Sequence, residues 1–273
     1  MTRVLSGAVL VAFAIAVVWF APPWLFFGVA ELLLVLAFDE YRRLAAACGA
    51  PIPGVAAGVA TVIASVGVTS AFRLGDEVLA NGIALDAALM SAFVVLAALS
   101  LATFPTGRSD QGALARASAS VFPMLYLGLP IGALIALRAL RGREALFLLM
   151  LTVMVSDTAQ YYTGRAFGRR LLAPAISPKK TVEGAIGGFV FGAALLSVLG
   201  AWWLAPLPVV LRALLGVAVV ALGIAGDLFE SMLKRSAGVK DSSALIPGHG
   251  GILDRIDALL FAAPIYYIVV KYA

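Results

Sequence analysis

Long apolar runs, each about the length needed to cross a lipid bilayer, recur along the whole sequence. Of the 273 residues, 62% are hydrophobic and 13% are charged, whereas soluble domains carry about 25% charged residues. One soluble core cannot bury this apolar excess, so the chain must use lipid as part of its solvent. The sequence therefore predicts an all-α, polytopic integral membrane protein.

The number of spans follows from the lengths of these runs, because a membrane-spanning helix needs about 20 mostly apolar residues. The apolar runs lie near 4–21, 24–41, 51–72, 86–104, 118–137, 145–162, 184–205, 208–226 and 258–272. Glycines and prolines mark the turns, among them Gly142 and Pro22-Pro23. We expect about nine transmembrane helices, the last of which could begin as early as Ile252.

Lysines and arginines set the expected orientation. With nine spans, fourteen of them fall on the side of the N-terminus and six on the other side. Positive charge collects in cytoplasmic loops, which predicts an N-terminus inside and a C-terminus outside. The two longest polar segments, 163–183 and 227–257, both fall on the predicted cytoplasmic side and are the candidate site. The lone Cys48 excludes an intramolecular disulfide, and no basic or aromatic stripe points to nucleic acid.

The first polar constellation continues from an apolar run and reads Gly-Asp-Leu-Phe-Glu-Ser-Met-Leu-Lys-Arg over 226–235. On a helix, positions three, four and seven apart share a face. Asp227, Glu230, Ser231 and Lys234 therefore form one polar stripe. Asp227 is expected near the membrane boundary, where an acid is expensive and usually functional; the alternative is an ordinary solvated helix end.

The second constellation holds the only histidine, in Gly-His-Gly-Gly at 248–251. Glycines let the backbone approach a ligand closely, and free N–H groups there or at the next helix N-terminus would favour phosphate oxygens. Mg²⁺ prefers one or two carboxylates together with substrate phosphates. We therefore predict Asp227 and Asp254 as a metal pair, with His249 facing phosphate or serving the structure.

The third constellation combines Ser-Asp-Thr at 156–158 with Ser-Pro-Lys-Lys-Thr at 177–181. Phosphoryl chemistry needs neutralisation of charge and positioning more than a strong nucleophile, which the two lysines could supply. Taken alone, this pair is equally typical of an ordinary juxtamembrane segment. Glu31, in mid-span, could be functional or a hydrogen-bonded structural group. A cluster at the end of the same run is expected at the membrane interface; its members are Asp39, Glu40, Arg42 and Arg43.

Residues 231–257 resemble the C-terminal signature of the phosphatidate cytidylyltransferase family, also called CDP-diacylglycerol synthases. The pattern Ser-x-apolar-Lys-Arg, then Lys-Asp, then Pro-Gly-His-Gly-Gly-apolar-x-Asp-Arg-apolar-Asp is filled at every fixed place. The resemblance covers 156–264 firmly, and the first 150 residues agree mainly in being hydrophobic. Val182 stands where the family pattern leads us to expect Trp, and Ala159-Gln160 where Gly is more usual, which puts substrate fit in question rather than the reaction.

The resemblance implies that CTP and phosphatidate give CDP-diacylglycerol and pyrophosphate with Mg²⁺, in a plasma membrane. It also implies a K⁺ ion beside Mg²⁺ and a homodimer, neither of which the residue pattern shows. We expect one membrane domain over 1–273, with hydrophobic helices in 1–144 and catalytic helices and cytoplasmic loops in 145–273. The expected catalytic residues are Asp227, Asp254, Lys234, Arg235 and Arg255. The expected substrate-binding residues are Ser177, Lys179, Lys180, Thr181, Lys240, Asp241, His249, Gly250, Gly251, Asp257 and Asp157.

Two other functions compete with this interpretation. A CTP-dependent kinase for a polyprenol-type lipid would share the nucleotide site and release CDP. A transporter would place Glu31 and Asp157 on an ion pathway and predicts paired broken helices with internal symmetry, which the sequence does not display. The leaving group distinguishes the two enzymes, and vesicle uptake without a lipid product would indicate the transporter.

Overall fold

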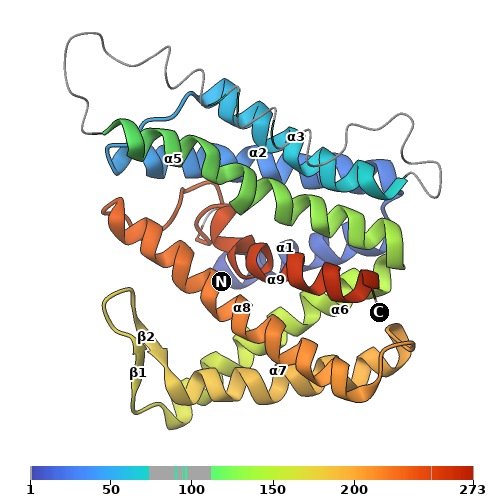
Figure 1. The fold of residues 1–273 in the computed structure, drawn as a ribbon. Coiled ribbons are helices and arrows are strands. Elements are labelled where there is room, and N and C mark those ends of the chain that lie inside the picture. The colour runs from blue at the N-terminus through green and yellow to red at the C-terminus, as the bar shows by residue number, and fades with distance from the viewer. Residues whose placement is uncertain are drawn as a thin grey trace, which may run out of the picture.

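The computed structural model describes residues 2–73, 90, 94, 96, 112–246 and 248–272, without side chains for 2–6 and 70–73. It is a bundle of helices with one small hairpin (Figure 1). The N-terminal helices are α1 (Thr2–Phe20), α2 (Pro23–Ala47) and α3 (Gly54–Arg73). Then follow α5 (Ala113–Pro123), the π-helical turn η1 (Met124–Gly128) and α6 (Leu129–Phe167). The remaining elements are β1 (Leu171–Ala173), β2 (Ser177–Thr181), α7 (Val182–Trp203), α8 (Val209–Ser236) and α9 (Leu253–Tyr272).

The expected all-helical membrane class is confirmed in its coarse form. Three helical stretches of the described chain are long and apolar enough to cross a membrane: Ala113–Phe167, Val182–Trp203 and Val209–Ser236. The apolar run at 86–104 lies outside the described residues, apart from isolated positions. The count of nine spans therefore stays a prediction. The last helix begins at Leu253, close to the early start expected near Ile252.

Two expected spans, 118–137 and 145–162, fall within the continuous stretch α5–η1–α6. The chain reverses inside α6 at Gly142, whose φ of +82° and ψ of −178° are not helical. A side chain rarely adopts this left-handed φ, so glycine suits the turn. Gly142 therefore separates two helical segments that cross the bundle in opposite directions, as its place between two apolar runs predicts (Figure 1).

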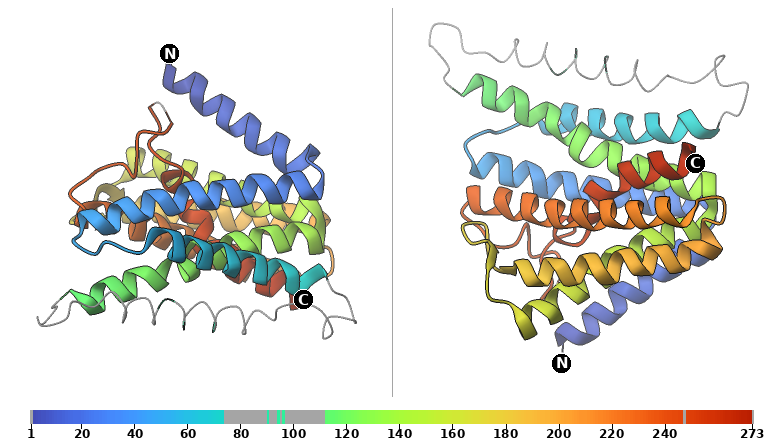
Figure 2. Two further views of the ribbon diagram at one scale, coloured as in Figure 1. Left: turned by 90° about the horizontal axis from the view of Figure 1, so that it is seen from above. Right: turned by 60° about the horizontal axis from the view of Figure 1, so that its bottom comes forward.

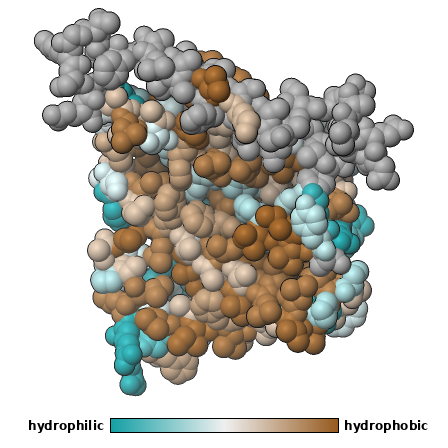
Figure 3. All heavy atoms as spheres, viewed as in Figure 1, coloured by the Kyte–Doolittle hydropathy of each residue, from teal (hydrophilic) through white to brown (hydrophobic). Residues whose placement is uncertain are grey.

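The surface between the two ends of the bundle is broadly apolar. Figure 3 shows a brown field flanked by teal residues at the left and right edges. Large side chains such as Trp24, Phe191 and Leu214 are exposed along the helices, as expected for a surface that faces lipid. The bundle thus has two polar ends, which we call the hairpin end, after β1–β2, and the Gly142 end.

Helix α1 contacts the Gly-His-Gly-Gly loop near its start and the Gly142 end near its last residues. Near its start, Gly7 lies beside the imidazole of His249. At its other end, the carbonyl oxygens of Val18 and Ala21 accept hydrogen bonds from Arg138, close to Gly142 in sequence. Figure 2 shows the start of α1 projecting from the other helices. The first helix therefore runs from the Gly-His-Gly-Gly loop toward the Gly142 end.

Candidate active site

The two longest polar segments of the sequence meet at the hairpin end. The ammonium of Lys180, on β2, lies 2.6 Å from a carboxylate oxygen of Asp227, on α8. The lysine side chain is 20% exposed and that of the aspartate 35%. Solvent therefore reaches this ion pair, and so could a charged solute. The structure thus brings together the lysine pair and the acidic stripe, although nearly fifty residues separate them.

The hairpin is an element that the sequence analysis did not predict. Leu171 pairs with Thr181 and Ala173 with Ser177 in antiparallel register. The Glu183 carboxylate anchors it by accepting the backbone N–H groups of Arg169 and Arg170 at 3.0 and 3.2 Å. These contacts fix the strand that presents Lys180 to α8.

Thr181, which we expected to bind substrate, has a structural contact. Its hydroxyl oxygen accepts the backbone N–H of Gly184 at 3.1 Å and caps the N-terminus of α7. A threonine at this position satisfies one of the N–H groups that a helix leaves without an internal partner. The junction between β2 and α7 is therefore fixed by the residue after Lys180.

Lys234 lies at the centre of a buried charged group. One helical turn earlier on α8, Glu230 pairs with its ammonium, and Asp254 of α9 contacts the same nitrogen. The side chains of Lys234, Glu230 and Asp254 are 10%, 1% and 6% exposed. Buried charges are stable only when paired and hydrogen-bonded. The predicted polar stripe of α8 is therefore present, and Glu230 is its most deeply buried member.

Asp254 is held by backbone and hydroxyl donors as well as by the lysine. One of its oxygens accepts the N–H of Gly251 at 2.7 Å, and the N–H and hydroxyl of Ser242 at 2.9 and 2.8 Å. Burial opposes ionisation of this carboxyl, but Lys234, Gly251 and Ser242 outweigh it and lower its pKa to about 2. Asp254 is outside the three candidate spans and is ionised at neutral pH.

The Gly-His-Gly-Gly loop folds around carboxylates of the protein itself. A Cβ on Gly251 would lie 2.2 Å from the Ser242 hydroxyl and 2.4 Å from both oxygens of Glu40. The backbone N–H groups of Ile252 and Leu253 donate to Glu40 at 2.9 and 2.8 Å. We expected free N–H groups here to favour a phosphate; the structure gives these donors to the protein's own carboxylates.

Glu40 is a residue of the candidate site that sequence reasoning missed. It is 3% exposed and also accepts hydrogen bonds from the hydroxyls of Ser242 and Ser243. The sequence pattern groups it with its neighbour Asp39 at the membrane interface, but Asp39 pairs with the surface arginines at positions 42 and 43 and Glu40 does not. Adjacent residues of a helix point about 100° apart, and those arginines follow Asp39 by three and four residues. This spacing was the signal that Asp39 faces water.

Close packing of α8 on α9 adds further acids to the site. A Cβ on Gly226 would lie 2.4 Å from the backbone oxygen of Asp257, so the helices meet here without an intervening side chain. The charges of Asp227 and Asp157 both act on the Asp257 carboxyl. These three acids, from α6, α8 and α9, therefore share one region.

A divalent metal is compatible with this donor set. Among the described residues, no three His, Cys, Asp or Glu side chains converge on one metal position. Mg²⁺ commonly takes one or two carboxylates, with phosphates and waters completing its six oxygens. Asp227 and Asp254 are hard oxygen donors of this kind, and a carboxylate oxygen has more than one acceptor direction. The chemistry of these two donors is thus of the kind that Mg²⁺ takes together with a phosphate, and the metal pair itself stays a prediction.

Several predicted site residues are partly or fully exposed. His249 is half-buried, and Arg235 donates to the backbone oxygen of Val239 at 3.0 Å. The exposed members of the predicted set are Asp157, Lys179, Arg235, Lys240, Asp241 and Arg255. Beside the hairpin, a cavity of about 370 Å³ is lined by Ala166, Phe167, Gly168, Arg169 and Glu183. Most of these exposed members of the predicted set are cations.

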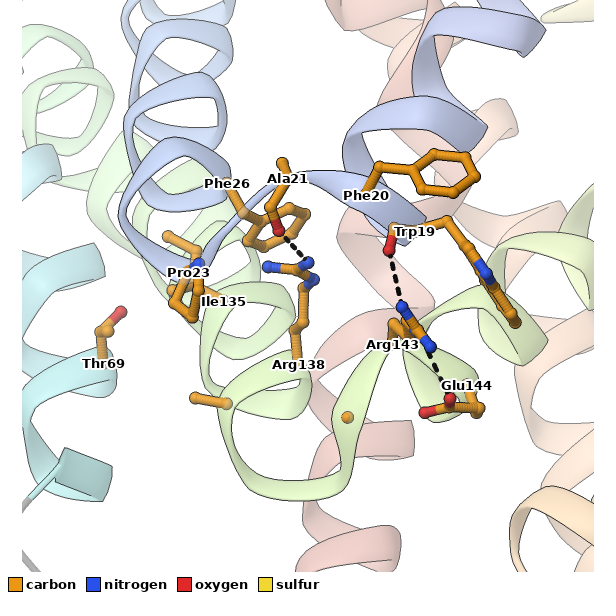
Figure 4. Close-up of a pocket in the computed structure, with 12 residues that line it drawn as sticks. Trp19, Phe20, Ala21, Pro23, Phe26, Thr69, Ile135, Arg138, Arg143 and Glu144 are labelled. Atoms are coloured by element: carbon orange, nitrogen blue, oxygen red, sulfur yellow. Dashed lines mark hydrogen bonds and ion pairs between the residues drawn. The ribbon is translucent and has the colours of Figure 1, made fainter.

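A second cavity, of about 390 Å³, lies at the Gly142 end. Figure 4 shows Arg138 and Arg143 pointing toward the end of α1, with aromatic side chains around them. Arg138 contacts the carbonyl oxygen of Ala21, and Arg143 that of Trp19 at 3.0 Å. This cavity is remote from the predicted site residues.

Sequence comparisons agree with the signature. Over 120 residues the chain is 52% identical to a phosphatidate cytidylyltransferase of Synechocystis, covering 43% of this chain and 40% of that one. It is 38% identical over 150 residues to one of Aquifex aeolicus, covering 55% and 56%. It is 34% identical over 183 residues to one of Helicobacter pylori, covering 67% and 64%.

The first of these matches span about half the length of the relatives concerned or less. The sequence profile of the cytidylyltransferase family, in contrast, matches residues 1–273. The profile includes both the hydrophobic N-terminal helices and the charged C-terminal segments. The chain therefore belongs to the cytidylyltransferase family.

Proposed function

We propose that the protein transfers CMP from CTP to phosphatidate, giving CDP-diacylglycerol and pyrophosphate. The observation that carries the proposal is the Lys180–Asp227 ion pair, which joins the hairpin to α8, the helix that also carries Lys234 and its buried contact with Asp254. Proteins of Synechocystis and Aquifex aeolicus that are 52% and 38% identical to this chain over part of their length bear the name phosphatidate cytidylyltransferase. A site with both carboxylates and ammonium groups suits the meeting of a metal with two polyanions.

The chemistry asks little of a general base, because the lipid phosphate is already an anion. One of its oxygens forms a bond to the α-phosphorus of CTP. The bond from that phosphorus to the oxygen bridging to the β-phosphorus breaks, and its electron pair leaves with pyrophosphate. Lys180 and Lys234 neutralise charge on the phosphates, and the exposed cations Lys179, Lys240 and Arg255 draw both substrates toward the site.

Asp227 and Asp254 would hold Mg²⁺, which supplies a Lewis acid that reduces repulsion between the phosphates. In this proposal Lys180 and Lys234 turn from their carboxylates toward phosphate oxygens when substrates bind. Lys180 is the better placed to do so, because its pair with Asp227 is partly exposed. A K⁺ ion beside Mg²⁺ and a homodimer stay predictions of the family resemblance.

The proposed location is a bacterial plasma membrane with the hairpin end in the cytoplasm. CTP is a cytoplasmic solute, and the bias of lysine and arginine favours that side for the two polar segments. The N-terminus is then inside and the C-terminus outside. Phosphatidate would reach the site from the inner leaflet.

The decisive experiment follows the phosphorus atoms of CTP. Purified protein in detergent receives phosphatidate, Mg²⁺ and CTP labelled at either the α- or the γ-phosphorus. The proposal expects α-label in the lipid and γ-label in pyrophosphate. With a polyprenol-type alcohol in place of phosphatidate, transfer of γ-label and release of CDP would indicate the kinase. Uptake by vesicles without a labelled lipid would indicate the transporter.

A further inference from the structure

Glu40 connects the hydrophobic N-terminal half of the chain to the signature segment. One of its oxygens accepts the Ser243 hydroxyl at 2.7 Å and the Ile252 N–H at 2.9 Å. The other accepts the Ser242 hydroxyl at 2.9 Å and the Leu253 N–H at 2.8 Å. Both oxygens thus act only as acceptors in these contacts, and all four donors belong to residues 242–253.

The position requires an anion rather than any polar group of similar size. Each oxygen of Glu40 accepts one hydroxyl and one backbone N–H. A glutamine would replace one of these oxygens with an NH₂ group, which cannot accept a hydrogen bond from those donors. The N-terminus of α9 also favours negative charge, because its first N–H groups carry a partial positive charge. Glu40 therefore supplies the N-terminal anion of the helix that bears Asp254.

Ser242 links Glu40 to Asp254. Its hydroxyl lies 2.9 Å from Glu40 and 2.8 Å from Asp254, and the single hydroxyl proton must serve both carboxylates. Consecutive backbone N–H groups are divided between the same two carboxylates. The N–H of Gly251 donates to Asp254, whereas those of residues 252 and 253 donate to Glu40. Any displacement of Glu40 is thus transmitted directly to the donors of Asp254.

We propose that Glu40 is a positioning residue for the transfer reaction, acting through Ser242 and the start of α9 to hold Asp254 beside Lys234. The inference rests on the proposed function. Glu40 touches the donors that orient Asp254 and is itself buried away from the surface. Outer residues that orient a metal ligand typically contribute about 10- to 100-fold in metal affinity or activity.

The test compares Glu40→Gln with Asp39→Asn in the full-length protein. Both replace a carboxylate with an amide in the same helical turn, but Asp39 pairs only with surface arginines in the contacts described. Glu40→Gln should lower kcat about 10- to 100-fold and raise the half-saturating Mg²⁺ concentration by a similar order. The KM for CTP should stay within about twofold, because the hydrogen bonds of Glu40 do not involve Lys180 or Lys234, which are proposed to bind the phosphates. Asp39→Asn should match the unmodified protein.

Hydrogen exchange gives a readout independent of turnover. In Glu40→Gln the amides of residues 242–255 should exchange faster, while those in α7 keep their protection. A loss of folded protein alone would reduce total activity without changing the Mg²⁺ dependence. If Glu40→Gln does not fold, Ser242→Ala removes the shared hydroxyl and should shift the Mg²⁺ dependence in the same direction.

Three outcomes separate the inference from the function on which it rests. Normal kcat and Mg²⁺ dependence in Glu40→Gln, or in Ser242→Ala where that variant is needed, would overturn the positioning role and leave the proposed function intact. An unmodified protein that makes no CDP-lipid would overturn both. A shift in Mg²⁺ dependence together with local exchange in 242–255 would support the inference.

Discussion

The two polar ends of the bundle use their charges differently. At the hairpin end, Lys180 and Lys234 pair with carboxylates carried by other segments or turns. At the Gly142 end, Arg138 and Arg141 donate to backbone oxygens near the ends of α1 and α9. Arg138 also lies 4.6 Å from the centre of the Phe26 ring. Lysines at the first end thus pair with carboxylates across segments, whereas Arg138 and Arg141 at the second satisfy helix termini beside an exposed Arg143–Glu144 pair.

This difference teaches which charges are available for chemistry. The last carbonyl groups of a helix lack internal partners, so an arginine that serves them is part of the scaffold. A lysine beside a carboxylate can exchange that partner for a phosphate oxygen, while the freed carboxylate takes a metal ion. Charge alone therefore does not identify the site; the kind of partner does.

The largest expected effect comes from Asp227→Asn. Loss of the carboxylate removes a proposed Mg²⁺ ligand and the partner of Lys180, so kcat should fall roughly 10³-fold, equivalent to about 4 kcal/mol of barrier. The rate of CDP-diacylglycerol formation measures this fall in kcat. The control is Glu144→Gln, which also removes one carboxylate but lies at the Gly142 end. Comparable rates for the two variants would contradict the assignment of the chemistry to the hairpin end.

Lys180→Met should have the next largest effect. It keeps much of the apolar stem but removes the ammonium proposed to neutralise phosphate, so kcat/KM for CTP should fall roughly 100-fold. The thermal unfolding midpoint should change little, because the ion pair is partly exposed. A variant that loses stability but keeps its kcat/KM would instead make Lys180 a structural residue.

Arg138→Met tests the opposite end and should affect stability rather than turnover. It removes hydrogen bonds to the backbone oxygens of Val18 and Ala21 at 3.2 and 2.5 Å. We expect a loss of about 2 kcal/mol of stability, because charged donors to buried acceptors contribute about 1.5–3 kcal/mol. Thermal unfolding in detergent measures the loss. A fall in kcat for the protein that remains folded would contradict the assignment.

Arg143→Met should have the smallest effect. Its side chain is 47% exposed, and its contacts are an ion pair with Glu144, a hydrogen bond to the Trp19 backbone oxygen and a guanidinium 4.9 Å from the centre of the Trp19 ring. Exposed contacts of this type contribute about 0–1 kcal/mol, so both stability and kcat should stay close to those of the unmodified protein. Thermal unfolding of Arg138→Met and Arg143→Met in parallel compares the half-buried arginine with the exposed one at this end.

Apolar periodicity predicted most helices because lipid exposure imposes long uninterrupted runs. The stripe on α8 was equally predictable: helical spacing places Glu230 one turn before Lys234, and the structure pairs them. The hairpin was not predicted, since Ser177-Pro-Lys-Lys-Thr has little strand propensity. Its pairing depends on Glu183 and the register with β1, neither of which a short local pattern reveals.

Long-range contacts account for what the sequence could not reveal about the site. Nothing near Glu40 indicates that its hydrogen-bond donors come from residues 242–253. For the same reason, the glycines around His249 indicated a close approach of the backbone without revealing the partner, which is the pair of carboxylates of Glu40 and Asp254.

The contact between Glu40 and Leu253 also bears on biogenesis, because it joins positions 213 residues apart. At synthesis rates of about 5–20 residues per second, α2 emerges from the ribosome roughly 10–40 s before the start of α9. During that interval the Glu40 carboxylate has none of these four donors. The four hydrogen bonds to Glu40 can therefore form only after residues 242–253 have been synthesised, and truncation before residue 242 would leave α2 with an acid that its own helix cannot satisfy.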